Sequence, residues 1–152
     1  VKVNSIPVSE AVKTDKGYWM IQRSWQPGDT VSCEMEMEPE RVYAHPMVRT
    51  DAGCVALRRG PIIYTFEGVD NGEDLQTLRI PREAKIEALP YQADLLEGIV
   101  ALRVTGCRKK TAVNPALYAE DAAPEEMVTL QAIPYYAWCN RGMTHMRVWM
   151  QE

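Results

Sequence analysis

The stretch IPYYAWCNRG, residues 133–142, gathers side chains that could do chemistry. Cys139, one of four cysteines, follows Trp138 and lies close to Arg141. A nearby cation lowers the pKa of a thiol and favours the nucleophilic thiolate. Activation also needs a positioned base, and no motif ties either histidine of the chain to this cysteine. We therefore interpret Cys139 as a structural residue, buried like most free cysteines.

The same stretch contains signals for a bend in the chain. Alternation typical of a strand breaks at Pro134, which cannot donate a hydrogen bond to a sheet, and Asn140-Arg141-Gly142 is typical of a turn. We predict that the chain leaves its sheet here and that aromatic rings close the end of the domain, with their polar atoms bonded at its rim. The residues of this predicted structural corner are Tyr135, Tyr136, Trp138 and Arg141.

Aromatic residues also mark an N-terminal segment, YWMIQRSW at residues 18–25. Its strict alternation predicts a strand with Trp19, Ile21, Arg23 and Trp25 on one face. An inner sheet face is the favoured interpretation, because large aromatic rings dominate core burial. Arg23 fits such a core poorly and leaves two alternatives open, a platform for sugar rings and an interface with another domain or a second copy. The candidate interface or sugar-stacking residues are Trp19, Arg23 and Trp25.

Acidic side chains at alternate positions, Glu34, Glu36 and Glu38, form a further candidate. Glycoside hydrolysis commonly uses two carboxylates across the scissile bond. Here the acids alternate with apolar residues between Val31 and Met37, which is the binary pattern of a strand with one solvated face. We therefore predict a charged surface and no catalytic pair.

Metal binding is another chemistry that these residue types suggest. His45 and His145 could join Cys33 or Cys107 at a zinc ion, but no pair has a recognised ligand spacing. Instead, His45 is expected to fix a turn before Pro46, and His145 to lie on a partly exposed strand face. We predict no catalytic, cofactor-binding or metal-binding residue in this chain, and free thiols for its four cysteines.

Composition indicates a folded protein without a surface for nucleic acid. Of the 152 residues, 46% are hydrophobic and 25% are charged, and the net charge is -4. No apolar run is long enough to span a bilayer, and no export signal is recognisable, so we expect no membrane partner and a cytoplasmic location. Since the chain begins at Val1, we expect it to be part of a longer protein.

Short strands separated by turn residues predict the fold. The turn QPGD should join residues 18–25 and 30–38 as a hairpin, and Gly60-Pro61 should form a bulge or a switch between sheets. Residues 82–89 have equal signals for a short strand and a helical turn. Further strands are expected at residues 42–48, 62–66, 99–105, 127–133 and 143–150, with a long surface loop at 111–126. The pattern indicates an all-β, antiparallel, jelly-roll-like β-sandwich with little or no helix.

Several of these segments together resemble one family. The blocks RVYAHPMVRTDAGCVALRRGPIIYTFEGVDN, AIPYYAWCNRG and MRVW, preceded by GYWMIQRSWQPGDTV, are similar in sequence and order to the C-terminal region of the β-L-arabinofuranosidase-like glycoside hydrolases, family 127. The resemblance covers nearly the whole chain. It implies that residues 1–152 are the C-terminal β-sandwich region, with an internal boundary near 38–41. Residues 1–38 would end a first sandwich, and residues 41–152 would form a second.

In that family an N-terminal helical barrel carries a cysteine nucleophile on a zinc site and an acid/base glutamate. None of those motifs matches this chain, so the resemblance implies that the barrel and its zinc are absent and that the chain by itself is inactive. The expected function is a non-catalytic domain that supports the barrel and takes part in oligomers. The alternative is an independent carbohydrate-binding module. The expected partners are accordingly the protein's own barrel, a further copy and a carbohydrate.

Overall fold

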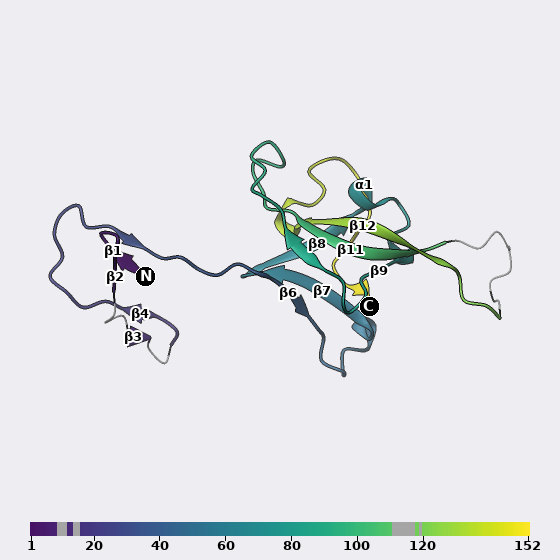
Figure 1. Cartoon of the computed structure of the whole chain (residues 1–152), viewed down its shortest axis with the longest axis horizontal. Helices are drawn as coiled ribbons and strands as arrows, with labels where there is room; N and C mark the ends of the chain where they lie inside the picture. The colour runs from purple at the N-terminus through teal and green to yellow at the C-terminus, as the bar shows by residue number, and fades with distance from the viewer. Residues whose placement is uncertain (9–11, 14–15, 111–117, 119) are drawn as a thin grey trace. The chain divides into compact units, whose positions relative to one another are not determined.

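The computed structural model describes residues 1–8, 12–13, 16–110, 118 and 120–152. The chain divides into two compact units, Val1–Glu36 and Met37–Glu152 (Figure 1). We call them the N-terminal unit and the C-terminal unit. The division falls just before residues 38–41, where the sequence predicts a boundary.

The N-terminal unit contains short strands only. In the order of the chain they are β1 (Lys2–Val3), β2 (Ile6–Pro7), β3 (Val12–Lys13), β4 (Trp19–Met20) and β5 (Val31–Ser32). β1 pairs antiparallel with both β2 and β5, and β3 pairs antiparallel with β4. Asn4 and Ser5 turn the chain between β1 and β2 with φ of 50° and 68°. Both lie in the left-handed region that a type I′ hairpin requires and that Asn tolerates.

The predicted hairpin between residues 18–25 and 30–38 is wrong. The QPGD turn does form, since the Asp29 N–H donates to the Gln26 carbonyl at 3.1 Å. However, the strands on either side of it pair with other segments, β4 with β3 and β5 with β1. The predicted dry face is also absent, because Val31 is 53% exposed and Met35 is 75% exposed. Alternation defines the two faces of a strand but does not specify which segment pairs with it.

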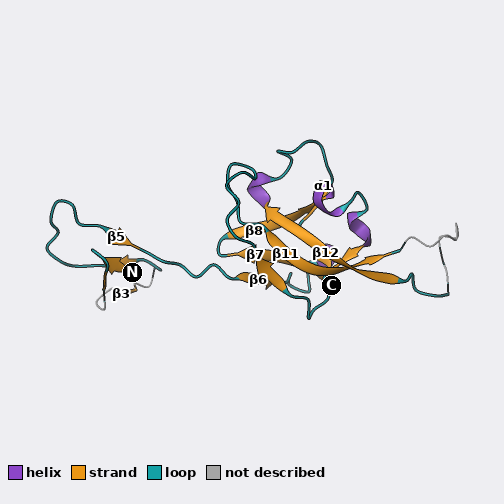
Figure 2. Cartoon of the chain, turned by 45° about the horizontal axis from the view of Figure 1, so that its top comes forward, coloured by secondary structure: helices purple, strands orange, loops and turns teal. Residues whose placement is uncertain are grey.

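The C-terminal unit is built around longer strands. It contains β6 (Pro39–Val42), β7 (Cys54–Arg59), β8 (Ile62–Glu67), β9 (Leu78–Arg79), β10 (Ile86–Ala88), β11 (Leu102–Lys109), β12 (Glu125–Pro134), β13 (Met146–Arg147) and β14 (Met150–Gln151). Its helical pieces are η1 (Arg49–Asp51), the four-residue α1 (Gly68–Asn71), η2 (Leu75–Thr77) and η3 (Tyr135–Ala137). Figure 2 shows how little helix accompanies the strands.

The strands of the C-terminal unit form a curled sheet. Their order is β13-β8-β12-β11-β9-β14-β7-β6, with β10 on β11, and a further pairing of β7 with β8 brings the sheet back on itself. All pairs are antiparallel except β14 with β9. β11 pairs with β12 along its full length, from Leu102 opposite Ala132 to Lys109 opposite Glu125 (Figure 1). The all-β, antiparallel sandwich expected from the sequence is confirmed.

The core of the C-terminal unit lies inside this sheet. Its members are fully or almost fully buried: Val55, Leu57, Tyr64, Phe66, Leu75, Leu78, Ile80, Leu102, Val104, Leu130, Ala132 and Met150. Gly106 in β11 permits close packing, because a Cβ there would stand 2.9 Å from the Arg79 carbonyl oxygen and 2.4 Å from Leu130 Cδ1. Glycine is therefore required at this position by the approach of neighbouring strands.

Several other predicted elements differ in part from those in the structure. Gly60-Pro61 is the turn of a tight β7–β8 hairpin and not a bulge, since Arg59 pairs directly with Ile62. Within residues 82–89 only Ile86–Ala88 form a strand, β10, and the strand expected at 143–150 is divided into β13 and β14. The strand expected at 42–48 ends at Val42. Of the loop predicted at 111–126, residues 111–117 and 119 lie outside the described residues.

Candidate functional site

A buried ion pair organises the predicted corner in the C-terminal unit. β8 ends at Glu67, whose side chain is 1% exposed although it is ionisable. The Arg141 guanidinium donates to Glu67 Oε2 and to both carboxylate oxygens of Asp70, reaching Asp70 Oδ1 at 2.8 Å. The hydrogen bonds to these two carboxylates raise the pKa of Arg141 above its already high value. The two terminal nitrogens of the cation thus join α1 to the segment after β12, while its buried Nε has no partner among the described residues.

The second oxygen of Glu67 fixes the backbone of that segment. The Cys139 N–H donates to Glu67 Oε1 at 2.7 Å, and Cys139 has a φ of 64°. Its thiol lies on the surface, 3.8 Å from the Gly142 carbonyl oxygen. Burial of Cys139 is therefore a wrong prediction. In this site the residue contributes its backbone N–H to the carboxylate, and no His lies among the contacts of its thiol.

A buried asparagine extends the same network. Asn71, 5% exposed at the end of α1, donates through Nδ2 to the carbonyls of Glu67 and Gln131, both at 2.9 Å. Its Oδ1 accepts from the Gln131 N–H at 2.9 Å. Asn71 thus ends a short helix, with Gly72 after it, and anchors that helix on β12. Glu67 and Asp70 were not predicted from the sequence, although a Glu at the end of the apolar run IIYTFE was a usable signal.

The aromatic residues of the corner do not close the domain. Tyr135 and Tyr136 in η3 are 44% and 65% exposed, so the prediction that their rings plug the end of the sandwich is wrong. Trp138 is half-buried. Ala137 is the buried member of the stretch, at 3%, and packs with Ile99 and other apolar residues in a second cluster. The chain does leave its sheet after Pro134, as expected.

The N-terminal candidates lie on an exposed surface. Trp19 and Trp25 are 49% and 47% exposed, so the interpretation of an inner sheet face is wrong. They do not share one strand either, because β4 ends at Met20. Arg23 and Trp25 are brought together, with the guanidinium carbon 5.3 Å from the ring centroid, which is the geometry of a cation–π contact.

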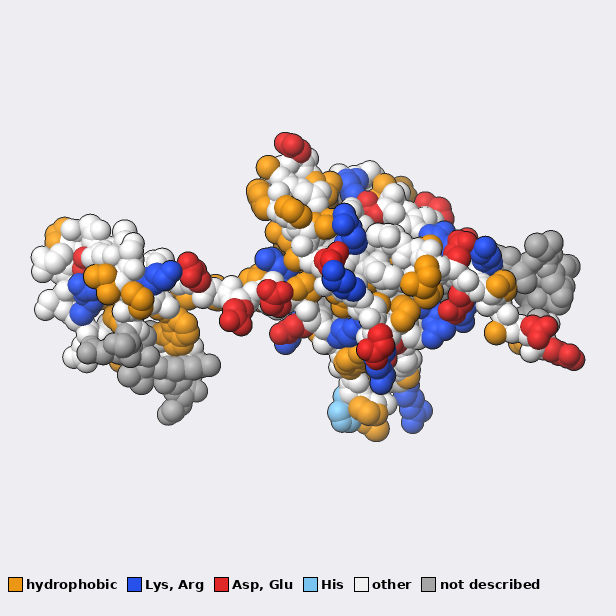
Figure 3. Space-filling model, in the orientation of Figure 1, with side chains coloured by type: hydrophobic (Ala, Val, Ile, Leu, Met, Phe, Trp, Pro, Cys, Tyr) orange, Lys and Arg blue, Asp and Glu red, His pale blue; other side chains and the backbone are white. Residues whose placement is uncertain are grey.

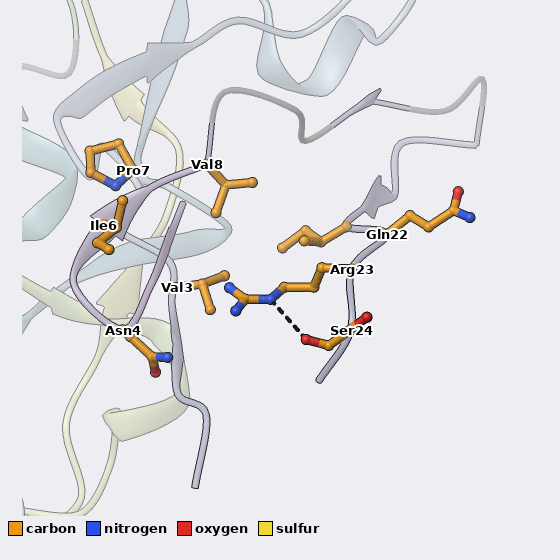
Figure 4. Close-up of a pocket in the computed structure, with 9 residues that line it drawn as sticks. Val3, Asn4, Ile6, Pro7, Val8, Gln22, Arg23 and Ser24 are labelled. Carbon is orange, nitrogen blue, oxygen red and sulfur yellow. Dashed lines mark hydrogen bonds between the residues drawn. The ribbon is translucent and has the colours of Figure 1, made fainter. Parts of the chain in front are cut away.

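Arg23 also reaches into a hollow of the N-terminal unit. Figure 4 shows its side chain directed toward Val3, with Nε donating to the Ser24 carbonyl at 3.5 Å. The cavity has a volume of about 430 Å³ and is lined by Val3, Asn4, Ile6, Pro7, Val8, Ile21, Gln22, Arg23 and Ser24. Its walls combine apolar side chains with polar ones in nearly equal measure, which suits a protein surface or a sugar equally.

A polar network holds the N-terminal turns together. Asn4 Oδ1 accepts from the Thr30 N–H at 2.9 Å, and Asn4 Nδ2 donates to Asp29 Oδ1 at 2.7 Å. The Gln26 N–H donates to Asp29 Oδ2 at 2.9 Å. The bond from Gln26, followed by the bond from Asn4, lowers the pKa of Asp29 because both favour the charged carboxylate.

The remaining candidates from the sequence either hold a turn or lie at the surface. His45 Nδ1 accepts from the Met47 N–H at 3.2 Å and its carbonyl accepts from the Val48 N–H, so it fixes a turn as predicted. The His145 side chain is 79% exposed and Glu34 pairs with Lys2 at 3.3 Å on the surface. All four cysteines are free. Across the part of the chain that the structure describes, no group of three His, Cys, Asp or Glu side chains could hold a metal ion.

The fold and these sites define a class of protein, an all-β sandwich module with a rigid polar corner and an exposed aromatic surface. Charged side chains of both signs are interspersed over the face of the C-terminal unit seen in Figure 3. In the described ranges no helix is long and apolar enough to cross a membrane.

Comparison with known proteins gives the family. Residues 39–151 match the model of the glycoside hydrolase family 127 C-terminal domain, and the chain belongs to this family. It is 37% identical over 132 residues to the non-reducing end β-L-arabinofuranosidase of Bifidobacterium longum subsp. longum. That match covers 82% of this chain and 20% of the relative.

Solved structures of the family are similar over the whole chain. A family 127 β-L-arabinofuranosidase from Geobacillus stearothermophilus has a TM-score of 0.88 and 46% identity, covering 99% of this chain and 24% of that one. Another family 127 β-arabinofuranosidase has a TM-score of 0.82 and 32% identity, with coverage of 99% and 22%. The chain therefore spans a quarter or less of the length of these relatives.

Proposed function

We propose that this chain is a non-catalytic β-sandwich part of a glycoside hydrolase and that it supports a catalytic barrel in the same protein. One observation carries the proposal, the unpartnered surface of the N-terminal unit. Among its described hydrophobic residues Val3 alone is buried, at 2%. Its large exposed apolar residues are Ile6, Tyr18, Trp19, Met20, Trp25, Val31 and Met35.

Such a surface is costly in water without a partner. A piece of this size buries too little apolar area to be stable alone, and contiguous exposed apolar groups mark interaction sites. Trp, Tyr, Met and Arg are also the residues enriched at protein interfaces. The barrel is the proposed partner because relatives that match this chain extend far beyond it.

The catalytic part of the proposal is tested with the chain by itself. Incubation with a nitrophenyl β-L-arabinofuranoside should release no sugar, since no described residue combines a nucleophile with a positioned base. Hydrolysis that survives repurification and is lost in Cys139→Ala would overturn the proposal.

The supporting role is tested in a complete enzyme. In the Geobacillus stearothermophilus relative, the region that matches this chain is replaced by residues 1–152, which are 46% identical to it. The chimera should retain activity, and Trp19→Ala with Trp25→Ala should lower its unfolding temperature. Met143→Ala is the matched control, because Met143 is 100% exposed but lies in the C-terminal unit. An equal effect of the control and the double variant would contradict the supporting role.

The second candidate function is a carbohydrate-binding module. The exposed rings of Tyr18, Trp19 and Trp25 favour it, since sugars stack on accessible aromatic faces. Titration with an arabino-oligosaccharide should then shift tryptophan emission, and the shift should shrink in Trp19→Ala or Trp25→Ala. No change in emission with any soluble glycan would exclude the module and leave the supporting role.

A further inference from the structure

A second cavity, in the C-terminal unit, lies between the loop that follows β10 and the corner segment that follows β12. Its volume is about 470 Å³, within the range of small-molecule pockets. It is lined by Leu96, Glu97, Tyr136, Ala137 and Asn140. One wall therefore comes from the loop between β10 and β11, and the other from η3 and the residues after it (Figure 1).

The first wall is a turn in an unfavourable conformation. The Gly98 N–H donates to the Leu95 carbonyl at 2.9 Å, while Leu96 and Glu97 have φ of 51° and 61°. Two successive left-handed residues are the pattern of a type I′ turn, for which Asn-Gly is preferred. Leu and Glu have a steric penalty there, which persists only when the surroundings compensate it.

The rest of the loop holds this turn in place. Gln92 and Ile99 form an antiparallel bridge at its base, and Ile99 is 1% exposed. Gly98 has a φ of 103°, and a Cβ there would stand 1.8 Å from the Tyr91 hydroxyl, so the tyrosine packs directly on the glycine backbone. The Leu96 and Glu97 side chains are thus presented to the cavity by a fixed backbone.

The second wall is equally well held. Asn140 Nδ2 donates to the Ala137 carbonyl at 3.1 Å, and no described residue donates to its Oδ1. The neighbouring Cys139 N–H is bonded to Glu67, which Arg141 neutralises. The backbone that carries the Glu97 carboxylate, the Asn140 amide oxygen and the Tyr136 phenol is therefore held in place on both sides of the cavity.

These groups suit one ligand chemistry. An exposed aromatic ring such as Tyr136 stacks on the C–H face of a sugar, while Glu97 and the Asn140 amide oxygen accept bonds from hydroxyl groups. Asp94 is exposed on the same loop as Glu97, so the rim is acidic and disfavours uronic acids. We propose that the cavity between Leu96-Glu97 and Tyr136-Asn140 binds a neutral sugar residue. This site is separate from the surface invoked for the proposed function and does not depend on it.

Nitrogen-15 NMR titration of the whole chain tests the site. L-arabinose and a β-linked arabinobiose are the neutral probes, and galacturonic acid is the acidic one. The neutral probes should shift amide signals at residues 95–99 and 136–141, and galacturonic acid should bind at least about tenfold more weakly. Shifts that avoid both segments, or equal binding of the acidic probe, would overturn the proposal.

Variants separate this cavity from other aromatic surfaces. Tyr136→Ala should weaken binding of arabinobiose by about tenfold, the typical value of one aromatic contact. Tyr135→Ala is the matched control, since Tyr135 is the adjacent exposed ring but does not line the cavity. Trp19→Ala with Trp25→Ala should leave the titration unchanged. Binding that is lost only in the latter pair would overturn the proposal and move the sugar to the N-terminal unit.

A last variant tests whether Glu97 serves ligand binding or the fold at its left-handed position in the turn. Asn tolerates the left-handed region, so Glu97→Asn should raise the unfolding midpoint while it weakens binding of arabinobiose. Opposite changes in stability and binding would show that the Glu97 side chain is used by the ligand. A fall in the midpoint would mean that Glu97 serves the fold, and the proposal would be overturned.

Discussion

The two units of this chain differ in how much of their apolar surface they bury. The C-terminal unit encloses a cluster of fully buried side chains within a curled sheet, and its polar groups at Glu67 and Asn71 have partners. The N-terminal unit buries Val3 and is otherwise organised by hydrogen bonds around Asn4 and Asp29. A short segment can therefore have well-defined turns without a core, and its exposed apolar surface is the observation on which the proposed supporting role rests.

Loss of Arg141, the partner of the buried Glu67, should have the largest effect. Arg141→Ala leaves the Glu67 carboxylate buried without its cation, which should lower the free energy of unfolding by about 3–5 kcal/mol. Urea unfolding followed by circular dichroism measures this. Arg103→Ala, an exposed arginine on β11, should change stability by less than about 0.5 kcal/mol. Adding Glu67→Gln to Arg141→Ala should recover part of the loss, and no recovery would contradict the assignment.

Close packing in the C-terminal unit should give the next effect. Gly106→Ala places a methyl group against the Arg79 carbonyl and Leu130, so the free energy of unfolding should fall by about 1–3 kcal/mol. Thr105→Ala, at the exposed neighbouring position, is the control. If both variants unfold at the same urea concentration, the strands are not as closely packed as described.

In the N-terminal unit, loss of a hydrogen-bonding side chain should affect only the residues around it. Asn4→Ala removes the bonds to Thr30 and Asp29 and strains the turn, so hydrogen exchange at the Thr30 amide should quicken by about tenfold. Exchange at the Val104 amide, in the core of the C-terminal unit, should not change. Equal acceleration at both amides would show that the two units unfold together and would remove the contrast between them.

Acid should produce the smallest effect, also confined to the N-terminal unit. Because the folded pKa of Asp29 lies below its unfolded value, its contribution to stability is present above about pH 4 and is lost as the pH falls through the folded pKa. The Gln26 amide signal should therefore move at low pH and stay constant from there to neutrality. In Asp29→Asn this movement should disappear, and its persistence would assign the titration to another group.

Local sequence signals predicted much of the C-terminal unit. The strand expected at 99–105 begins only at Leu102, but from there buried Leu102 and Val104 alternate with exposed Arg103 and Thr105, and Pro134 marks the end of β12 as expected. These predictions hold because strand faces and proline geometry depend on neighbours along the chain. The hairpin in the N-terminal unit failed because β4 and β5 each had more than one segment to pair with.

By itself, the sequence determined the all-β class, the family through its blocks of matching residues, and the places where the chain turns. The tertiary structure alone decided that Arg141 meets Glu67, 74 positions away, and that Tyr136 faces the turn at Leu96-Glu97 across a cavity. It also decided that Trp19 and Trp25 lie at the surface. The physical reason is that periodicity and turn chemistry act over a few residues, whereas ion pairs, cavities and burial depend on which distant strands the sheet brings together.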